Sequence, residues 1–207
     1  SRKLMRALVT GFEAFGGDSV NATQSALKRL PPFIKQLEIE TLLLPVSFAR
    51  APAVLAAGIE QFAPEVVLCT GEAGDRHGFC LERVATNLCD ARIPDNDGAR
   101  PTGCKSIEDG PAAYFSTLPV NNMLAALRGA GLPSEISNSA GGYVCNHVFY
   151  ALMHMAAAGG HRWRGGFLHV PQAFDAVARP QARLLLDDVV RAIVVALDAA
   201  APHRAAG

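Results

Sequence analysis

The sequence predicts a single α/β domain of three layers, in which helices cover both faces of a mostly parallel central sheet. Short apolar segments, typical of buried strands, alternate along the chain with longer amphipathic segments that are typical of helices. No repeat, low-complexity stretch or linker divides the chain, so we expect residues 1–207 to form one domain. Half of the residues are hydrophobic, which is enough for a large buried core.

The predicted strands are apolar runs that end near glycine or proline. The clearest is residues 65–71 (EVVLCTG), because its β-branched run reaches a terminal glycine without interruption. The other predicted strands cover residues 5–11, 37–46, 79–90, 135–142 (with the turn that ends this segment) and 165–171.

The predicted helices lie between these strands. The first follows Asn21, a residue type favoured at helix N-caps, and should stop at Pro31 and Pro32. A segment rich in proline, aspartate and glycine, residues 93–109, is predicted to be a loop. The remaining predicted helices cover residues 47–62, 120–131, 143–160 and 181–200.

Repeated strand–helix crossovers favour a ligand site beyond the carboxyl ends of the strands. Several junctions after predicted strands are polar or rich in glycine, and we expect them to line one crevice. They are residues 11–18, 71–78, 137–142 and 169–172.

Composition excludes several classes of partner. The 19 basic and 19 acidic residues balance without clusters, which argues against nucleic acid or an anionic membrane surface. No apolar run is long enough for a signal peptide or a membrane span. The five cysteines are odd in number and lack a CxxC pair, so neither a disulfide framework nor a zinc site is indicated. These features together favour a cytoplasmic protein.

Cys145 is the candidate nucleophile. In SNSAGGYVCN it stands in the first turn of a predicted helix, where backbone N–H groups and the helix dipole favour a thiolate. The same N–H groups could hold a developing oxyanion. The alternative is a small buried hydrophobic residue, which is the interpretation we give to Cys69, Cys89 and Cys104.

A thiol nucleophile needs a histidine to exchange its proton. His169 ends the apolar strand GFLHVP, where its side chain can project into the crevice, although a core histidine would fit equally well. His147 is a weaker candidate because, two residues after Cys145 on one helix, it points away from it.

Glu82 is the candidate for the group that orients the histidine. It stands inside the apolar strand FCLERVA, an expensive place for an unpaired charge. A bond to a histidine would explain this position, and so would an ion pair with Arg83 or Arg92.

Four motifs, in this order, closely resemble the pyroglutamyl peptidase type I family. They are TGFEAFGGDSVNAT, GDRHGFCLERVATN, SNSAGGYVCN and GFLHVP, and the loop ARIPDNDG is similar too. The resemblance extends from about Leu8 to Leu197, which is nearly the whole chain.

The resemblance implies a metal-free cysteine peptidase that needs no cofactor and removes N-terminal pyroglutamate from peptides. It implies Cys145 as the nucleophile that forms a thioester, His169 as the acid and base, and Glu82 as the residue that orients His169. Arg92 matches an arginine that supports the oxyanion, although an ordinary salt bridge is its alternative.

The resemblance also implies an aromatic, mostly apolar pocket for the lactam ring. The matching or candidate residues, each of which could instead be plain core packing, are Phe12, Phe15, Ile93, Tyr143 and Val144. Family members are often homo-oligomers, and a dimer or tetramer could form through apolar residues that could equally cover the core. These are Ile107, Tyr114, Phe115 and Leu118.

Some positions depart from the family pattern. Glu72 stands where glutamine is common, next to the expected ring site, and Ala22 replaces a common proline. Gly142 stands where threonine or serine is common. Glu72 leaves open a thiol amidohydrolase for another small acyl or lactam group, and a non-catalytic binder of pyroglutamyl peptides is a further alternative.

Overall fold

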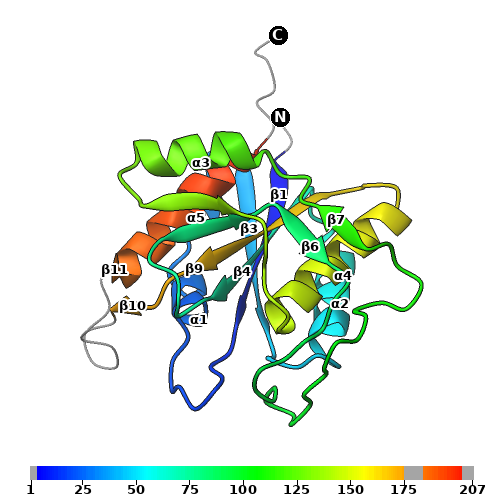
Figure 1. The fold of residues 1–207 in the computed structure, drawn as a ribbon. Coiled ribbons are helices and arrows are strands. Elements are labelled where there is room, and N and C mark those ends of the chain that lie inside the picture. The colour runs from blue at the N-terminus through cyan, green and yellow to red at the C-terminus, as the bar shows by residue number, and fades with distance from the viewer. Residues whose placement is uncertain (1–3, 175–183, 202–207) are drawn as a thin grey trace.

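The computed structural model describes residues 4–174 and 184–201, and a seven-stranded sheet forms its centre (Figure 1). The strand order is β2-β3-β1-β4-β9-β5-β8, and the pairs β3–β1, β1–β4, β4–β9 and β5–β8 are parallel. The strands are β1 (Met5–Phe12), β2 (Phe33–Ile34), β3 (Leu37–Leu44), β4 (Val66–Glu72), β5 (Phe79–Glu82), β8 (Ser134–Ser137) and β9 (Arg164–Val170).

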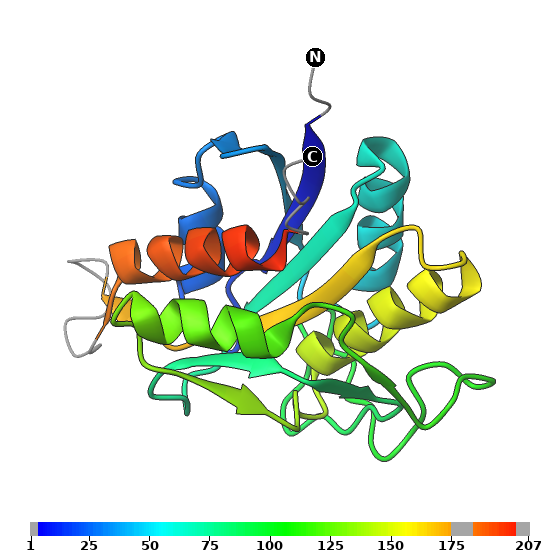
Figure 2. The same cartoon turned by 90° about the horizontal axis from the view of Figure 1, so that it is seen from above.

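Helices cover both faces of this sheet, so the predicted three-layer α/β/α fold is confirmed (Figures 1 and 2). One face carries α1 (Ala22–Leu27), α3 (Val120–Gly129) and α5 (Leu186–Ala200). The other face carries α2 (Ala51–Phe62) and α4 (Val144–Ala158). None of the helices in the described ranges has the length and apolar character needed to cross a bilayer.

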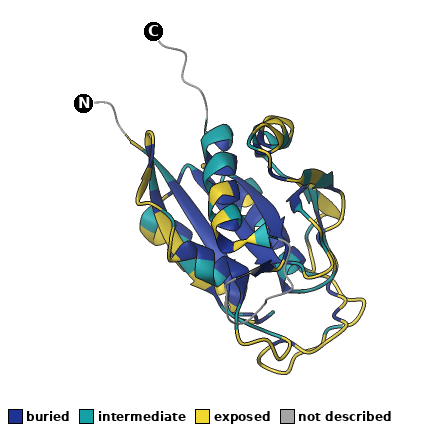
Figure 3. Cartoon of the chain, turned by 90° about the vertical axis from the view of Figure 1, so that its left-hand side faces the viewer, coloured by how far each residue is buried: buried dark blue, intermediate teal, exposed yellow. Residues whose placement is uncertain are grey.

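Strand β4 illustrates why the sheet is buried. All seven of its residues are buried, and its side chains alternate between the two layers. Leu68 packs with the α1, α3 and α5 layer, whereas Val67 and Cys69 pack with the α2 and α4 layer. Figure 3 shows the strands of the sheet as buried ribbon between the helices. An uninterrupted apolar run therefore predicted this strand well.

The predicted single strand over residues 79–90 is wrong. Strand β5 ends at Glu82, and β6 (Val84–Thr86) then pairs with β7 (Ala113–Phe115) in a separate two-stranded sheet. The chain changes partners at Arg83, whose N–H donates to Ser137 O while its carbonyl accepts from Ser116 N–H. Alternating hydrophobicity continues through both strands, so the pattern could not mark the break. A second small sheet joins β10 (Ala173–Phe174) and β11 (Leu184–Leu185).

Helix limits also differ from the predictions. Asn21 caps α1 as expected, because its Oδ1 accepts from Thr23 N–H at 2.9 Å. The helix ends at Leu27, before the prolines. Helix α2 starts at residue 51 and α5 at residue 186, both later than predicted, and residues 181–183 of the predicted last helix lie outside the described ranges.

Strands β5 and β8 run opposite to β9. The segment of residues 137–142 therefore follows a strand that points away from the carboxyl ends of β4 and β9. The strand before this segment is thus not parallel to β4 and β9, but the segment still meets the 71–78 junction, where Arg76 Nη2 donates to Ser139 O at 3.2 Å. The segment nevertheless leads directly into α4, which begins at Val144.

Candidate active site

Glu82 and His169 come together across the antiparallel pair β5–β9. Cys80 lies opposite His169 and Glu82 lies opposite Phe167, so Glu82 and His169 are diagonal neighbours on one face of the sheet. His169 Nδ1 lies 2.8 Å from Glu82 Oε1, and both side chains are buried. A carboxylate only accepts, so Nδ1 donates its proton, and Nε2 keeps the lone pair that can accept one.

Of the alternatives for Glu82, the structure favours the histidine. Arg83 is exposed and its guanidinium donates to Asn138 Oδ1 at 3.3 Å. Arg92 is also exposed, and no hydrogen bond or ion pair of its side chain occurs among the described residues. The structure thus brings Glu82 to His169, and it brings neither arginine to that carboxylate.

Cys145 is the second residue of α4, and its sulfur lies against the backbone of β4. A Cβ built on Gly71 would lie 2.6 Å from Cys145 Sγ and 2.9 Å from Phe167 Cζ. Gly71 pairs in parallel register with His169, so the side chains of both positions point to the same face, about 4.8 Å apart. The thiol and the imidazole therefore share that face, and only a glycine at position 71 leaves room for the sulfur.

Burial raises the pKa of the Cys145 thiol above its usual range, with Glu82 as the next largest cause. The backbone N–H of Cys145 lowers it, as a helix start should, but this effect is outweighed. The helix start thus acts in the predicted direction, but the net shift of the pKa is upward, so removal of the proton requires a base.

Several predicted pocket residues gather beside α4. The rings of Phe15 and Tyr143 lie 5.7 Å apart, and Tyr143 O–H donates to Pro94 O at 2.9 Å. Ile93 Cδ1 lies 3.4 Å from where a Cβ on Gly16 would be. Phe15, Tyr143 and the loop of Ile93 thus form one apolar group.

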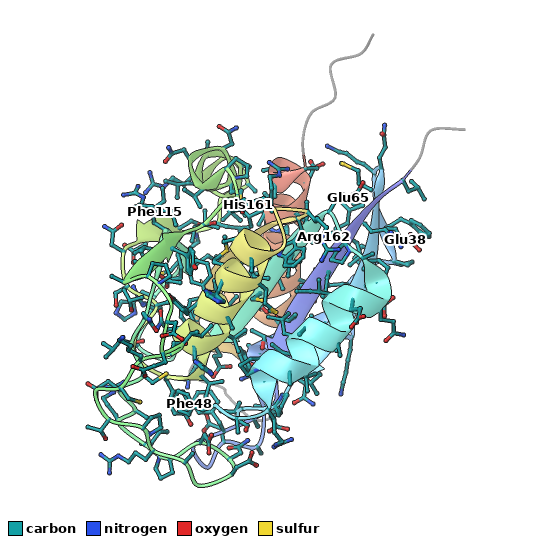
Figure 4. The ribbon with its side chains drawn as sticks, turned by 90° about the vertical axis from the view of Figure 1, so that its right-hand side faces the viewer. Glu38, Phe48, Glu65, Phe115, His161 and Arg162 are labelled. Carbon is teal, nitrogen blue, oxygen red and sulfur yellow. The ribbon has the colours of Figure 1, made fainter. Side chains whose placement is uncertain are left out.

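Sequence reasoning missed Phe48 as a member of this group. Its ring lies 5.6 Å from that of Tyr143. Figure 4 shows it at the amino ends of α2 and α4, far from Glu65 and Arg162. Its position at the start of a predicted helix gave no signal that it would meet Tyr143.

The other predicted binding residues are placed differently. Phe12 and Val144 are buried in the core under α2 and α4, as the alternative of core packing expected. Glu72 is also buried, and its Oε2 accepts from Ala22 N–H at 2.7 Å at the start of α1. Of the predicted subunit contacts, Leu118 is buried, whereas Phe115 is 70% exposed on β7.

The remaining histidine and cysteine candidates have other roles. His147 Nε2 lies 3.0 Å from Phe48 O, so it ties α4 to the segment before α2. All five cysteines are free; Cys69 and Cys89 are buried as predicted, but Cys104 is exposed, so the buried interpretation is wrong for it. Within residues 4–174 and 184–201, no group of three or more potential ligands could hold a metal ion.

A thiol at a helix start, next to a histidine held by a glutamate, defines the class of cysteine hydrolases. The sequence model of one family, pyroglutamyl peptidase, matches residues 5–203, and the chain belongs to that family. It is 44% identical over 195 residues to pyrrolidone-carboxylate peptidase of Streptococcus pyogenes serotype M1. The aligned region covers 93% of this chain and 91% of the relative.

Solved structures agree with this assignment. Pyroglutamyl peptidase I of Bacillus amyloliquefaciens superposes with a TM-score of 0.92 at 37% identity, covering 97% of this chain and 96% of that one. Pyrrolidone carboxyl peptidase of Thermococcus litoralis gives a TM-score of 0.88 at 37% identity, with coverages of 95% and 93%.

Proposed function

We propose that this protein removes the N-terminal pyroglutamyl residue from peptides, with Cys145 as nucleophile, His169 as acid and base, and Glu82 as the residue that orients His169. The observation that carries this proposal is the position of Cys145 Sγ over Gly71, on the face that carries the His169–Glu82 pair. Family membership supplies the substrate class.

The reaction begins with transfer of the Cys145 proton to His169 Nε2. The sulfur then attacks the carbonyl carbon between pyroglutamate and the next residue. Backbone N–H groups at the start of α4, with Arg92 turned inward, stabilise the oxyanion. The intermediate collapses to a thioester as the amine leaves with the proton from Nε2. Water, deprotonated by the same nitrogen, then hydrolyses the thioester and restores the thiol.

Glu82 acts through His169. As a carboxylate it holds the Nδ1–H tautomer, so that Nε2 faces the thiol with a lone pair, and it stabilises the imidazolium that forms after proton transfer. Its complete burial excludes water from this hydrogen bond and strengthens it.

The lactam ring is proposed to bind in the apolar group beside α4. Phe15, Ile93 and Tyr143 supply its walls, and the buried Phe12 and Val144 support them from below. Glu72, which follows Gly71 at the end of β4 and accepts from Ala22 N–H, is proposed to border the ring site from the side of α1. This acid is also the observation that favours a second candidate, an amidohydrolase for another small acyl or lactam group.

Hydrolysis of a chromogenic pyroglutamyl amide tests the proposal. We expect release by the wild type and a loss of about 10³-fold or more in Cys145→Ser. Cys104→Ser, which changes an exposed thiol, is the matched control and should keep full activity.

A substrate panel separates the two candidates. Cleavage of pyroglutamyl amides with prolyl and glutamyl amides ignored supports the peptidase. No release of any pyroglutamyl amide by the folded wild type under reducing conditions would sink the assignment. If alkylated Cys145 leaves the binding of pyroglutamyl peptides unchanged, a non-catalytic binder is favoured.

We further propose that the protein works in the cytoplasm as a homodimer or homotetramer. Five free thiols suit a reducing compartment, and the exposed Phe115 suits a subunit contact. Light scattering that returns the mass of a monomer at working concentration would contradict the oligomer.

A further inference from the structure

Arg76 reaches the catalytic carboxylate from the loop between β4 and β5. Its Nη2 lies 3.9 Å from Glu82 Oε1, the same oxygen that accepts from His169. The side chain is 28% exposed, so the guanidinium lies at the boundary between the buried carboxylate and solvent.

The guanidinium is held in place by the segment that leads to Cys145. Nη2 donates to Ser139 O at 3.2 Å and lies 3.4 Å from Ser137 Oγ. Nη1 lies 3.7 Å from Glu135 Oε1 on β8. Arg76 therefore connects the carboxylate behind the histidine with the chain that carries the nucleophile.

Glu82 needs such a cation. Its side chain is fully buried, and Oε2 has no hydrogen-bond partner among the described residues. A buried carboxylate with a single hydrogen bond to a neutral imidazole is expensive to keep ionised. Arg76 is the arginine whose ion pair with Glu82 the structure contains.

We propose that Arg76 is a positioning residue that keeps Glu82 ionised and directed at His169, and so sustains proton transfer between His169 and Cys145. This inference rests on the proposed function of the Cys145, His169 and Glu82 set. Arg76 touches neither substrate nor the reacting atoms in this account; it acts through Glu82 alone.

The charged and titratable groups around Glu82 are consistent with this role. His169 faces it from β9 and Arg76 from the β4–β5 loop, while Cys80 on β5 and Cys145 on α4 feel its charge. Glu135 on β8 shares the guanidinium from the solvent side, with 63% of its side chain exposed. Arg76 is the cationic member of this set.

The test compares Arg76→Gln with Arg83→Gln, a matched loss of an exposed guanidinium in the same region. We expect Arg76→Gln to lower kcat by about ten- to a hundredfold, the range seen when the outer partner of a metal-binding side chain is removed. KM should change little, because Arg76 acts through Glu82 and does not touch the substrate. Arg83→Gln should match the wild type.

Two further variants separate charge from structure. Arg76→Lys keeps the charge without the planar fork and should regain about tenfold over Arg76→Gln. In a Glu82→Gln background the Arg76 substitution should cost nothing more, since the charge it serves is gone. Additive losses, or an Arg76→Gln enzyme indistinguishable from Arg83→Gln, would overturn the proposal. If Arg76→Gln does not fold, a folded Arg76→Lys without activity overturns it, and one with most of its activity supports it.

Alkylation of Cys145 by iodoacetamide, followed by mass spectrometry of its peptide, separates this inference from the substrate assignment. An alkylation rate in Arg76→Gln that differs from that in Arg83→Gln supports the role of Arg76 even if no pyroglutamyl amide is cleaved. Equal alkylation with normal cleavage by the wild type contradicts Arg76 and leaves the proposed function intact.

Discussion

Two buried glutamates lie on the strands that flank β9, and their partners differ in kind. Glu82 on β5 bonds the imidazole of His169 and pairs with the guanidinium of Arg76. Glu72 on β4 accepts from a backbone N–H, that of Ala22 at the start of α1. Their exposed fractions, 0% and 7%, do not distinguish them.

The difference teaches that buried acids of similar exposure can have partners of different chemistry, an imidazole for Glu82 and a main-chain N–H for Glu72. A histidine exchanges protons, so a carboxylate bonded to it can influence proton transfer. A main-chain N–H does not release its proton, so it fixes only the position of the carboxylate that it bonds. Both carboxylates raise the pKa of Cys145, and Glu82 does so more strongly. Glu82 therefore has the stronger electrostatic effect on the sulfur of Cys145.

Glu82→Gln should have the largest effect on activity. A glutamine can present its NH₂ to His169 Nδ1 and hold the wrong tautomer, so we expect kcat to fall by about 10³- to 10⁴-fold. Circular dichroism and the melting temperature should stay close to those of the wild type, because the substitution is nearly isosteric. Glu72→Gln is the matched control with the same chemical change. A loss in Glu82→Gln no greater than in Glu72→Gln would remove the distinction between the two acids.

The pH dependence of Cys145 alkylation gives the next largest effect. Burial and Glu82 raise the pKa of the thiol, so the thiolate fraction below that pKa grows with pH. The rate should then rise by up to about tenfold per pH unit between about pH 6 and about pH 8. A rate that is already constant near pH 6 would indicate a stable thiolate and contradict the raised pKa. The Cys104 peptide from the same samples reports an exposed thiol.

How far the sequence predicted this site depends on the kind of signal each residue carries. Cys145, His169 and Glu82 stood out because a thiol at a helix start, a histidine at a strand end and an acid in an apolar strand are each unusual. The spacing of these residues could not predict that Glu82 bonds His169 rather than Arg83. That partner depends on the direction and register of β5 against β9.

The sequence analysis did not identify Gly71 and Arg76, which matter because other segments of the chain pack closely against them. Gly71 had a weak signal, because a glycine at the end of a buried strand often marks contact with another chain segment. Arg76 had none, because its contacts depend on how one loop meets the end of β8. Gly142, a departure from the family pattern, is explained only by the structure: a Cβ there would lie 2.8 Å from Asp90 O.

The fold was predicted at the level of layers and less well at that of strands. Runs such as residues 65–71 identify buried strands whatever their neighbours. The opposite direction of β5 and β8 and the break at Arg83 depend on long-range pairing, which hydrophobic periodicity does not encode.

The smallest predicted effect concerns the hydrogen bond between Glu72 and the start of α1. Ala22→Pro removes the N–H that bonds Glu72, while the backbone can accept proline: Ala22 is the first residue of α1 and Asn21 has φ −128° and ψ 127°. The buried carboxylate loses a donor, so the free energy of unfolding should fall by about 1–3 kcal/mol. Urea unfolding followed by fluorescence measures it.

The double variant decides whether this loss comes from the hydrogen bond or from the proline itself. The main chain of Ala22 and the side chain of Glu72 are in direct contact through this hydrogen bond. Removing a donor costs a neutral glutamine less than a carboxylate, so Ala22→Pro should cost less in a Glu72→Gln background, by about 1 kcal/mol. An equal loss of unfolding free energy in both backgrounds would mean that the proline ring is crowded. It would contradict a stabilising hydrogen bond between Glu72 and the start of α1.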